Sequence, residues 1–342
     1  MAPRVPEDNK KPGVCYAVTE DGIELPVIDI THPCFACDPS EDEVSAVIDR
    51  TVRAMEAAAK LPMEARLAMA KGSVLAQAWI KSLGTYMSGQ DTYLFRLGPE
   101  NLGEGYANAI DRQMAAGSMA LSFRLRLRDV ARLLAWGLKP VLETTPGRPL
   151  HLVNIGGGPS ADSLNALLLL QRESPELLRR PVFVHVLDVD EQGPNFGARA
   201  LEALSSVDGP FHGLSVGWRH VAYNWSDTIP LQALRSDLGD ECVVGISSEG
   251  ALFDYGSDAD VAANLSALHA GMPADTVLAG SVVRAPETMD PRLRTMMQQD
   301  EKRPVIRMMG LAHLSELARG AGWVVAESTG NPSHEIFRLA KG

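Results

Sequence analysis

Three consecutive glycines stand between two apolar runs in the stretch 151-HLVNIGGGPSADSLNALLLL-170. The first run predicts a strand that ends near residue 155, and the second predicts a helix that begins near 160–162. Glycines let a backbone turn sharply and let a ligand approach the main chain, and such a turn exposes the positive end of the following helix. We therefore expect Gly156, Gly157 and Gly158 to form a ligand-binding turn, although a tight turn that binds nothing has the same pattern.

Two ligand classes use this geometry, and the neighbouring residues favour one of them. The dinucleotide fingerprint G-x-G-x-x-G would place a third glycine at 161, where this chain has Ala161. No arginine or lysine follows to support a phosphate. Asp162 follows instead, and an acid at this point suits a ligand that carries an amino group and a sulfonium. The pattern favours S-adenosylmethionine over a nicotinamide dinucleotide.

The ends of the next two predicted strands carry further candidates. Asp188 ends 182-VFVHVLD-188, where an acid can accept hydrogen bonds from both ribose hydroxyls, whereas Asp190 is equally well explained as a surface acid. The third strand leads into 221-VAYNWSD-227. There Trp225 is expected to lie against adenine, unless it packs in the core, and Asn224 or Asp227 to bond the adenine amino group.

The fourth strand ends at Ser247, Ser248 and Glu249. Glu249 is the best-placed carboxylate for a general base, and the alternative is a helix-capping or solvated acid. The acids Asp254, Asp258 and Asp260 are better explained by the start of a helix than by a metal site. Cys34 and Cys37 form a CxxC, but a zinc ribbon needs a second pair and Cys15 and Cys242 are isolated, so no metal is expected.

Composition limits the partners. The 342 residues carry a formal net charge of −11, which disfavours a nucleic-acid partner. On a helix, Arg124, Arg128 and Arg132 would share one solvated face while Arg126 points elsewhere. No apolar run is long enough for a membrane span, no secretory signal is visible, and four cysteines suggest a reducing compartment, so we expect a cytoplasmic protein that binds a small molecule.

The elements that must position these residues divide the chain near residue 145. Residues 1–145 read as a helical cap that binds substrate, with helices over 42–61, 62–84 and 105–138 and a glycine-rich connection over 86–105; its methionine- and alanine-rich helices are compatible with a homodimer interface. Residues 146–342 read as the cofactor-binding domain, in which short apolar strands alternate with helices. The expected strands are 150–155, 182–188, 218–223, 241–247, 276–283, 322–328 and 334–341.

The order of these motifs over about 150–342 resembles the class I S-adenosylmethionine-dependent methyltransferases. The matching stretches are VNIGGGPSAD, VLDVD, NWSD, VVGISSEGALF and the late GLAHLSELARGAGWVVAE. The resemblance implies a Rossmann-like, doubly wound, mostly parallel seven-stranded α/β sheet with an α-helical N-terminal cap. The family often has an acid where this chain has Asn154 and a third glycine where it has Ser160.

The resemblance also implies the cofactor and its contacts, whereas the candidates in the N-terminal region are chosen as aromatic or polar residues of its irregular parts, where pocket-lining side chains often occur. The cofactor is S-adenosyl-L-methionine and the product is S-adenosyl-L-homocysteine. The expected cofactor-binding residues are Asn154, Gly156, Gly157, Gly158, Ser160, Asp162, Asp188, Val189, Asn224, Trp225, Ser247 and Ser248. The expected catalytic residues are Glu249, Tyr16 and His32, the last two if the N-terminal segment folds over the site, and the expected substrate contacts are Phe35, Tyr93, Phe253 and Tyr255.

The predicted function is in-line methyl transfer to the carbon, nitrogen or oxygen of a small, aromatic or indole-type natural product. The opening stretch 16-YAVTEDGIELPVIDITHPCF-35 resembles bacterial secondary-metabolism methyltransferases that act on indole alkaloids. Two alternatives stay open, a nicotinamide-dependent oxidoreductase and a catalytically silent protein that binds S-adenosylmethionine as a sensor or partner subunit.

Overall fold

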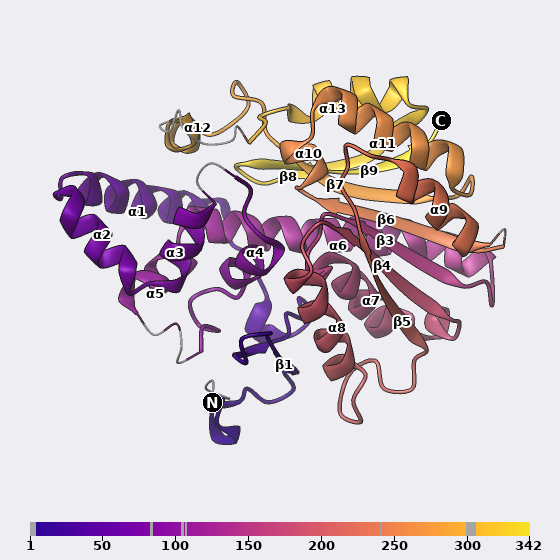
Figure 1. The fold of residues 1–342 in the computed structure, drawn as a ribbon, viewed down its shortest axis with the longest axis horizontal. Coiled ribbons are helices and arrows are strands. Elements are labelled where there is room, and N and C mark those ends of the chain that lie inside the picture. Colours follow the sequence, from indigo (N-terminus) through magenta and orange to yellow (C-terminus); the bar gives the residue numbers. More distant parts are fainter. Residues whose placement is uncertain (1–4, 83–84, 104–105, 107, 240, 299–305) are drawn as a thin grey trace.

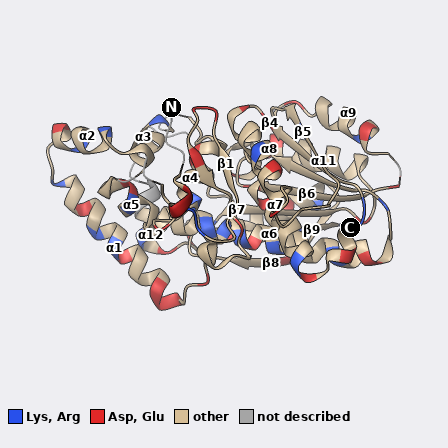
Figure 2. Cartoon of the chain, turned by 90° about the horizontal axis from the view of Figure 1, so that it is seen from below, with Lys and Arg blue, Asp and Glu red and all other residues tan. Residues whose placement is uncertain are grey.

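The computed structural model describes residues 5–82, 85–103, 106, 108–239, 241–298 and 306–342. Helices α1 to α5 form one side of the molecule in Figure 1, and a twisted sheet with helices on both faces forms the other. The long helix α6 (Ser118–Thr144) runs from the first part to the second, and the blue segments in Figure 2 mark basic residues along it. No helix in these ranges is both long and apolar enough to cross a membrane.

The sheet has seven strands in the order β5-β4-β3-β6-β7-β9-β8. Their bounds are Leu150–Ile155 (β3), Val182–Asp188 (β4), Val216–Ala222 (β5), Val243–Glu249 (β6), Val277–Val283 (β7), Trp323–Gly330 (β8) and His334–Lys341 (β9). β9 is antiparallel to β7 and β8, and the other neighbours are parallel. The expected doubly wound α/β sheet is confirmed. Because the chain goes to β4 on one side of β3 and to β6 on the other, the carboxyl ends of these strands form a switch point, the usual place for a ligand.

Helices bury both faces of the sheet, which explains why its central strands are almost continuously apolar. Leu150 and Leu152 pack with α6, α7 (Ala161–Glu173) and α8 (Gln192–Leu204). Val153 and Ile155 of the same strand pack on the opposite side with α9 (Ile229–Leu238), α11 (Asp258–Gly271) and α13 (Gly310–Gly320). Helix α11 begins with a capping box between Ser257 and Asp260. This agrees with our prediction that the acids here mark the start of a helix.

The N-terminal part has more helices than the sequence pattern suggests. They are α1 (Glu41–Ala59), α2 (Met63–Lys71), α3 (Val74–Lys81), α4 (Gly89–Arg96) and α5 (Ala109–Ala115). The stretch 62–84 breaks where the Ser73 side chain caps α3, and the last expected helix breaks at Gly117, before α6. Helix α4 lies in the stretch that we expected to be a connection, and Ser88 caps it by accepting from the Asp91 N–H.

The remaining elements are short. A hairpin pairs β1 (Tyr16–Val18) with β2 (Glu24–Pro26). Among the described residues, 3-10 turns span Glu7–Asn9, Pro33–Phe35 and Pro175–Leu178. Helices α10 (Leu252–Tyr255) and α12 (Pro291–Gln298) follow β6 and β7.

Two histidines lie side by side within the sheet. His151 Nδ1 on β3 and His185 Nε2 on β4 are 2.9 Å apart, and both side chains are buried. Burial lowers the pKa of His151, and burial together with His151 and Arg219 lowers the pKa of His185 to about 4. The pair is therefore uncharged at neutral pH.

We expect this pair to reduce stability as the pH falls from 7 to 5. In the unfolded chain His185 takes up a proton below its ordinary pKa of 6.5, whereas in the folded protein it stays neutral down to about pH 4. The folded state is therefore destabilised relative to the unfolded state as the pH falls from 6.5 to about 4. The loss at pH 5 is about 2 kcal/mol. In urea unfolding, His185→Gln, which keeps a hydrogen-bonding nitrogen but does not titrate, should lose about 2 kcal/mol less than the wild type between these pH values. Equal losses would contradict this account.

Candidate active site

The glycine turn connects β3 to α7 and touches the N-terminal helices. Gly156 and Gly158 have φ of +64° and +54°, in the left-handed region that favours glycine. A Cβ on Gly158 would lie 2.5 Å from the Cα of Gly89, the first residue of α4. The turn and the start of α4 can therefore meet only because both residues are glycines.

Behind this turn, Asn154, Asp162 and Ser247 form a buried hydrogen-bonded group. Asn154 Nδ2 donates to Asp162 Oδ1 at 2.7 Å and to Ser247 Oγ at 3.0 Å. Burial, with the charge of Glu249 adding to it, raises the pKa of Asp162 to about 6. None of the three lines the cavity described below, so our prediction that they contact the cofactor is not supported by their positions. They join the ends of β3 and β6 to the start of α7.

Asp188 ends β4 on the cavity side of the turn. Its Oδ2 accepts from the Gly158 N–H at 2.8 Å and its Oδ1 from the Asp190 N–H at 2.9 Å. Burial raises the pKa of Asp188, while these two N–H groups oppose the rise. Asp188, Val189, Asp190 and Trp225 all line the cavity.

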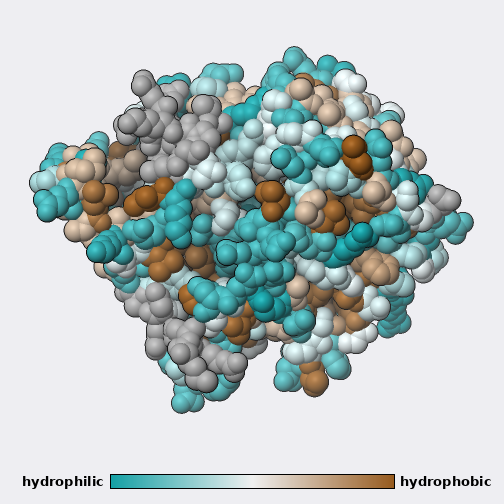
Figure 3. Space-filling view, in the orientation of Figure 1, coloured by the Kyte–Doolittle hydropathy of each residue, from teal (hydrophilic) through white to brown (hydrophobic). Residues whose placement is uncertain are grey.

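A cavity of about 690 Å³ extends from the glycine turn into the space between the sheet and helices α1, α3, α4, α5 and α6. Most of its wall on the helical side is apolar. The apolar side chains are Met55, Trp79, Met87, Met114, Met119, Phe123, Leu293, Ile306 and Met308. Met55 and Tyr86 are 40% and 43% exposed, so both reach the surface. Figure 3 shows hydrophobic residues on the surface of the helical side.

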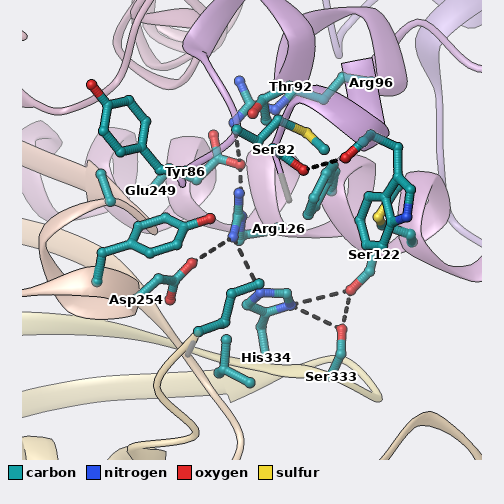
Figure 4. Close-up of a pocket in the computed structure, with 18 of the residues that line it drawn as sticks. Ser82, Tyr86, Thr92, Arg96, Ser122, Arg126, Glu249, Asp254, Ser333 and His334 are labelled. Carbon is teal, nitrogen blue, oxygen red and sulfur yellow. Dashed lines mark hydrogen bonds and ion pairs between the residues drawn. The ribbon is translucent and has the colours of Figure 1, made fainter. Parts of the chain in front are cut away.

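A group of charged side chains interrupts this apolar wall and converges on Arg126 of α6 (Figure 4). Arg126 Nε donates to Glu249 Oε1 at 3.0 Å, and its Nη1 donates to Asp254 Oδ2 at 3.2 Å. Arg96 of α4 pairs with the same Glu249 Oε1 at 2.8 Å. Burial raises the pKa of Asp254 to about 6, with Arg126 lowering it and Glu249 adding to the rise. We call these four residues the arginine–carboxylate cluster.

His334, the first residue of β9, completes this wall. Its Nε2 lies 3.1 Å from Arg126 Nη1, and because a guanidinium group only donates, Nε2 must accept. Nδ1 therefore carries the proton and donates toward Ser333 Oγ at 2.9 Å and Ser122 Oγ at 3.2 Å. Burial, together with Arg126 and Arg284, lowers the pKa of His334 well below its usual value, so the ring is neutral.

The structure brings part of the predicted site together around this cavity. The predicted residues that line it are Gly156, Gly157, Asp188, Val189, Trp225, Glu249 and Tyr255. The predicted residues that do not are Tyr16, His32, Phe35, Tyr93, Asn154, Gly158, Ser160, Asp162, Asn224, Ser247, Ser248 and Phe253.

Several of the predicted residues outside the cavity have other partners. Tyr16 Oη accepts from the Lys11 N–H, and His32 Nδ1 accepts from the Cys34 N–H. Tyr93 Oη donates to the Pro26 carbonyl and accepts from the Ile28 N–H, so it fastens the N-terminal segment. Phe35 belongs to a buried core, and Phe253 packs edge-on against Phe337. The N-terminal segment therefore packs beside the site without placing Tyr16 or His32 in it.

Sequence reasoning missed Arg96, Arg126 and His334 as residues of the site and assigned Asp254 only to a helix start. Arg126 had one available signal, because it is the arginine that falls off the face shared by Arg124, Arg128 and Arg132. The structure turns Arg126 inward, whereas Arg128 and Arg132 bond Asp38 near the surface. Within the described ranges, no group of three or more His, Cys, Asp and Glu side chains could hold a metal ion.

Comparisons with known proteins show likeness in structure alone. No protein-family model matches the chain, and no curated protein is similar to it in sequence. A possible exported protein from Bordetella parapertussis is 15% identical over 89% of this chain and 97% of its own, with a TM-score of 0.56, and so shares the fold.

Several other structural neighbours are S-adenosylmethionine-dependent methyltransferases. The 1,6-didemethyltoxoflavin-N1-methyltransferase of Burkholderia thailandensis is 19% identical, over 63% of this chain and 78% of its own, with a TM-score of 0.39. A methyltransferase from Clostridium acetobutylicum is 6% identical, over 62% of this chain and 92% of its own, with a TM-score of 0.40. These two likenesses are too weak to carry a residue role to this chain.

Proposed function

We propose that this protein is an S-adenosylmethionine-dependent methyltransferase that acts on a small, largely apolar acceptor. The observation that supports this most is a single cavity that joins two different surfaces. One end has the glycine turn and the strand-end acid Asp188, and the other end is the apolar chamber built by the helices. A cofactor and an acceptor held at these two ends would meet beside the arginine–carboxylate cluster.

The turn end fits the cofactor by its chemistry. Each oxygen of Asp188 accepts one backbone N–H, which leaves further acceptor capacity on both for a pair of ribose hydroxyls. A Cβ on Gly156 would lie 2.5 Å from the Ala251 Cβ and 3.6 Å from the Trp225 ring, so only glycine leaves this cradle open. Val189, 53% exposed, and Trp225 offer apolar surface to a flat base.

The bound cofactor supplies an electrophilic methyl group on a positively charged sulfur. Asp188 and the glycine turn would orient the cofactor at their end of the cavity. The methionine and aromatic side chains of the helices would exclude water from the other end. Positioning of this kind provides much of the rate of a displacement reaction. Glu249 is the last residue of β6 and lines the cavity. We keep it as the candidate group that contacts the reacting acceptor.

Calorimetric titration with S-adenosylhomocysteine tests this proposal, with NAD as the control ligand. We expect binding of S-adenosylhomocysteine alone, and Asp188→Ala should weaken it at least about tenfold, because a buried carboxylate that bonds two hydroxyls contributes more than about 1.4 kcal/mol. Asp208→Ala, which removes an exposed acid, should bind as the wild type does. Binding of NAD, or of neither ligand, would overturn the proposal.

A further inference from the structure

Glu249 and Asp254 line the cavity, and each has one buried oxygen that accepts no hydrogen bond from the described part of the chain. These oxygens are Glu249 Oε2 and Asp254 Oδ1, and the Val283 N–H lies close enough to the Asp254 carboxylate to lower its pKa. The other oxygen of each carboxylate already accepts from arginine, since Glu249 Oε1 accepts from Arg96 and Arg126, and Asp254 Oδ2 accepts from Arg126. Both free oxygens therefore belong to carboxylates that are held in place by the same guanidinium group (Figure 4).

An unpaired buried acceptor costs about 1 to 3 kcal/mol, so a group that donates to these oxygens would be strongly preferred. Within the arginine–carboxylate cluster itself the charges are balanced. Arg96 and Arg126 face Glu249 and Asp254, two of each sign, and His334 is neutral. An ionic ligand would add a net charge to a buried, balanced cluster, which is unfavourable.

We propose that the acceptor is an uncharged, largely apolar molecule whose N–H or O–H groups donate to Glu249 Oε2 and Asp254 Oδ1. This inference rests on the proposed function and specifies the acceptor's chemical class. Glu249 and Asp254 are then specificity-determining residues, because a site built to hydrogen-bond a donor rejects the analogue that lacks it. The apolar body of the acceptor lies against the methionine and aromatic side chains of the chamber.

Amide substitutions test these roles sharply. In Asp254→Asn the amide oxygen must face Arg126, which only donates, so the NH₂ group takes the place of the free oxygen. The free acceptor thus becomes a donor at nearly constant shape. Glu249→Gln has the same effect on Oε2. Asp129→Asn is the matched control, because Asp129 is also a buried acid that pairs with an arginine, Arg128, but does not line the cavity.

The experiment titrates the S-adenosylhomocysteine-loaded protein at pH 7.5 with three probes of one size. These are 2-naphthol, which donates an O–H, 2-methoxynaphthalene, which has no donor, and 2-naphthoate, which is an anion. The wild type should bind 2-naphthol at least about tenfold more tightly than either of the others. Asp254→Asn and Glu249→Gln should bring the ratio of 2-naphthol to 2-methoxynaphthalene close to one, and Asp129→Asn should keep the wild-type ratio.

The outcomes separate this inference from the function on which it rests. Normal binding of S-adenosylhomocysteine without a preference for 2-naphthol in the wild type, including failure of all three probes to bind, overturns the inference and leaves the function standing. A preference that survives both amide variants also overturns it. If Glu249→Gln instead weakens S-adenosylhomocysteine, Glu249 belongs to the cofactor and its assignment to the acceptor is wrong. If S-adenosylhomocysteine does not bind the wild type, both proposals fail.

Discussion

Replacing Arg126 with methionine should destabilise the protein by about 3 to 5 kcal/mol at pH 7.5, because removal of one member of a buried ion pair leaves its partners uncompensated. Arg126 contacts Glu249, Asp254 and His334, whose side chains are all buried, so its removal leaves three buried groups without their partner. Chemical unfolding followed by circular dichroism measures the loss. Methionine keeps the length of the apolar stem, so lost packing contributes little.

The pH dependence of this variant identifies the cause. Without Arg126 the pKa of Asp254 should rise beyond its present value of about 6, so the folded state binds protons that the unfolded state releases above about 4. Stability is then present at low pH and is lost as the pH rises, and the deficit should be smaller at pH 5.5 than at pH 7.5. Arg132 lies on the same helix as Arg126 and forms a surface ion pair with Asp38. Arg132→Met should cost less than about 1 kcal/mol of stability at both pH values. A deficit independent of pH would point to packing rather than charge.

Replacing Gly158 with alanine should cost about 2 to 5 kcal/mol in stability and at least about tenfold in affinity for S-adenosylhomocysteine. The new Cβ would sit 2.5 Å from the Gly89 Cα and 3.1 Å from its carbonyl carbon, which are backbone atoms that no side-chain rotation can move away. Overpacking of this kind costs about 1 to 3 kcal/mol, and the left-handed conformation adds about 1 to 2 kcal/mol. Urea unfolding and calorimetry report the two effects.

Gly147 provides the matched control for this substitution. It has a φ of +77°, but a Cβ there would meet no atom within 4 Å. Gly147→Ala should therefore show only the conformational cost of about 1 to 2 kcal/mol and no change in ligand affinity. If the two variants behave alike, the contact between the turn and α4 contributes nothing.

The sheet could be predicted from the sequence because its strands are short apolar runs between turns and helices, and the central ones are buried on both faces. Each run that we expected is a strand, with ends displaced by a few residues. The helical part was predicted less well because alanine and leucine favour helix on both sides of each break. The cap at Ser73 and the turn at Gly117 divide two of the predicted helices, and the glycines around α4 resemble a loop although Ser88 caps a helix there.

The residues of the site also divide into those that could be predicted from the sequence and those that could not. Parallel strands bring their carboxyl ends to one edge, so Asp188 and Glu249 could be placed at the cavity from order alone. Arg96, Arg126 and His334 come from α4, α6 and β9, which are distant in sequence and meet only through tertiary packing. Tyr16 and His32 were chosen for their chemistry, but the hydrogen bonds that occupy them are made by neighbours in the folded chain.

Helix α4 also has a mechanical consequence for the passage of ligands. Its first residue, Gly89, rests on Gly158 of the glycine turn, and its last, Arg96, pairs with Glu249 at the end of β6. One eight-residue helix thus connects the cofactor end of the cavity to its charged wall. Any displacement of this helix to admit a molecule would disturb both ends together. We therefore expect the affinities of the cofactor site and the acceptor site to change together.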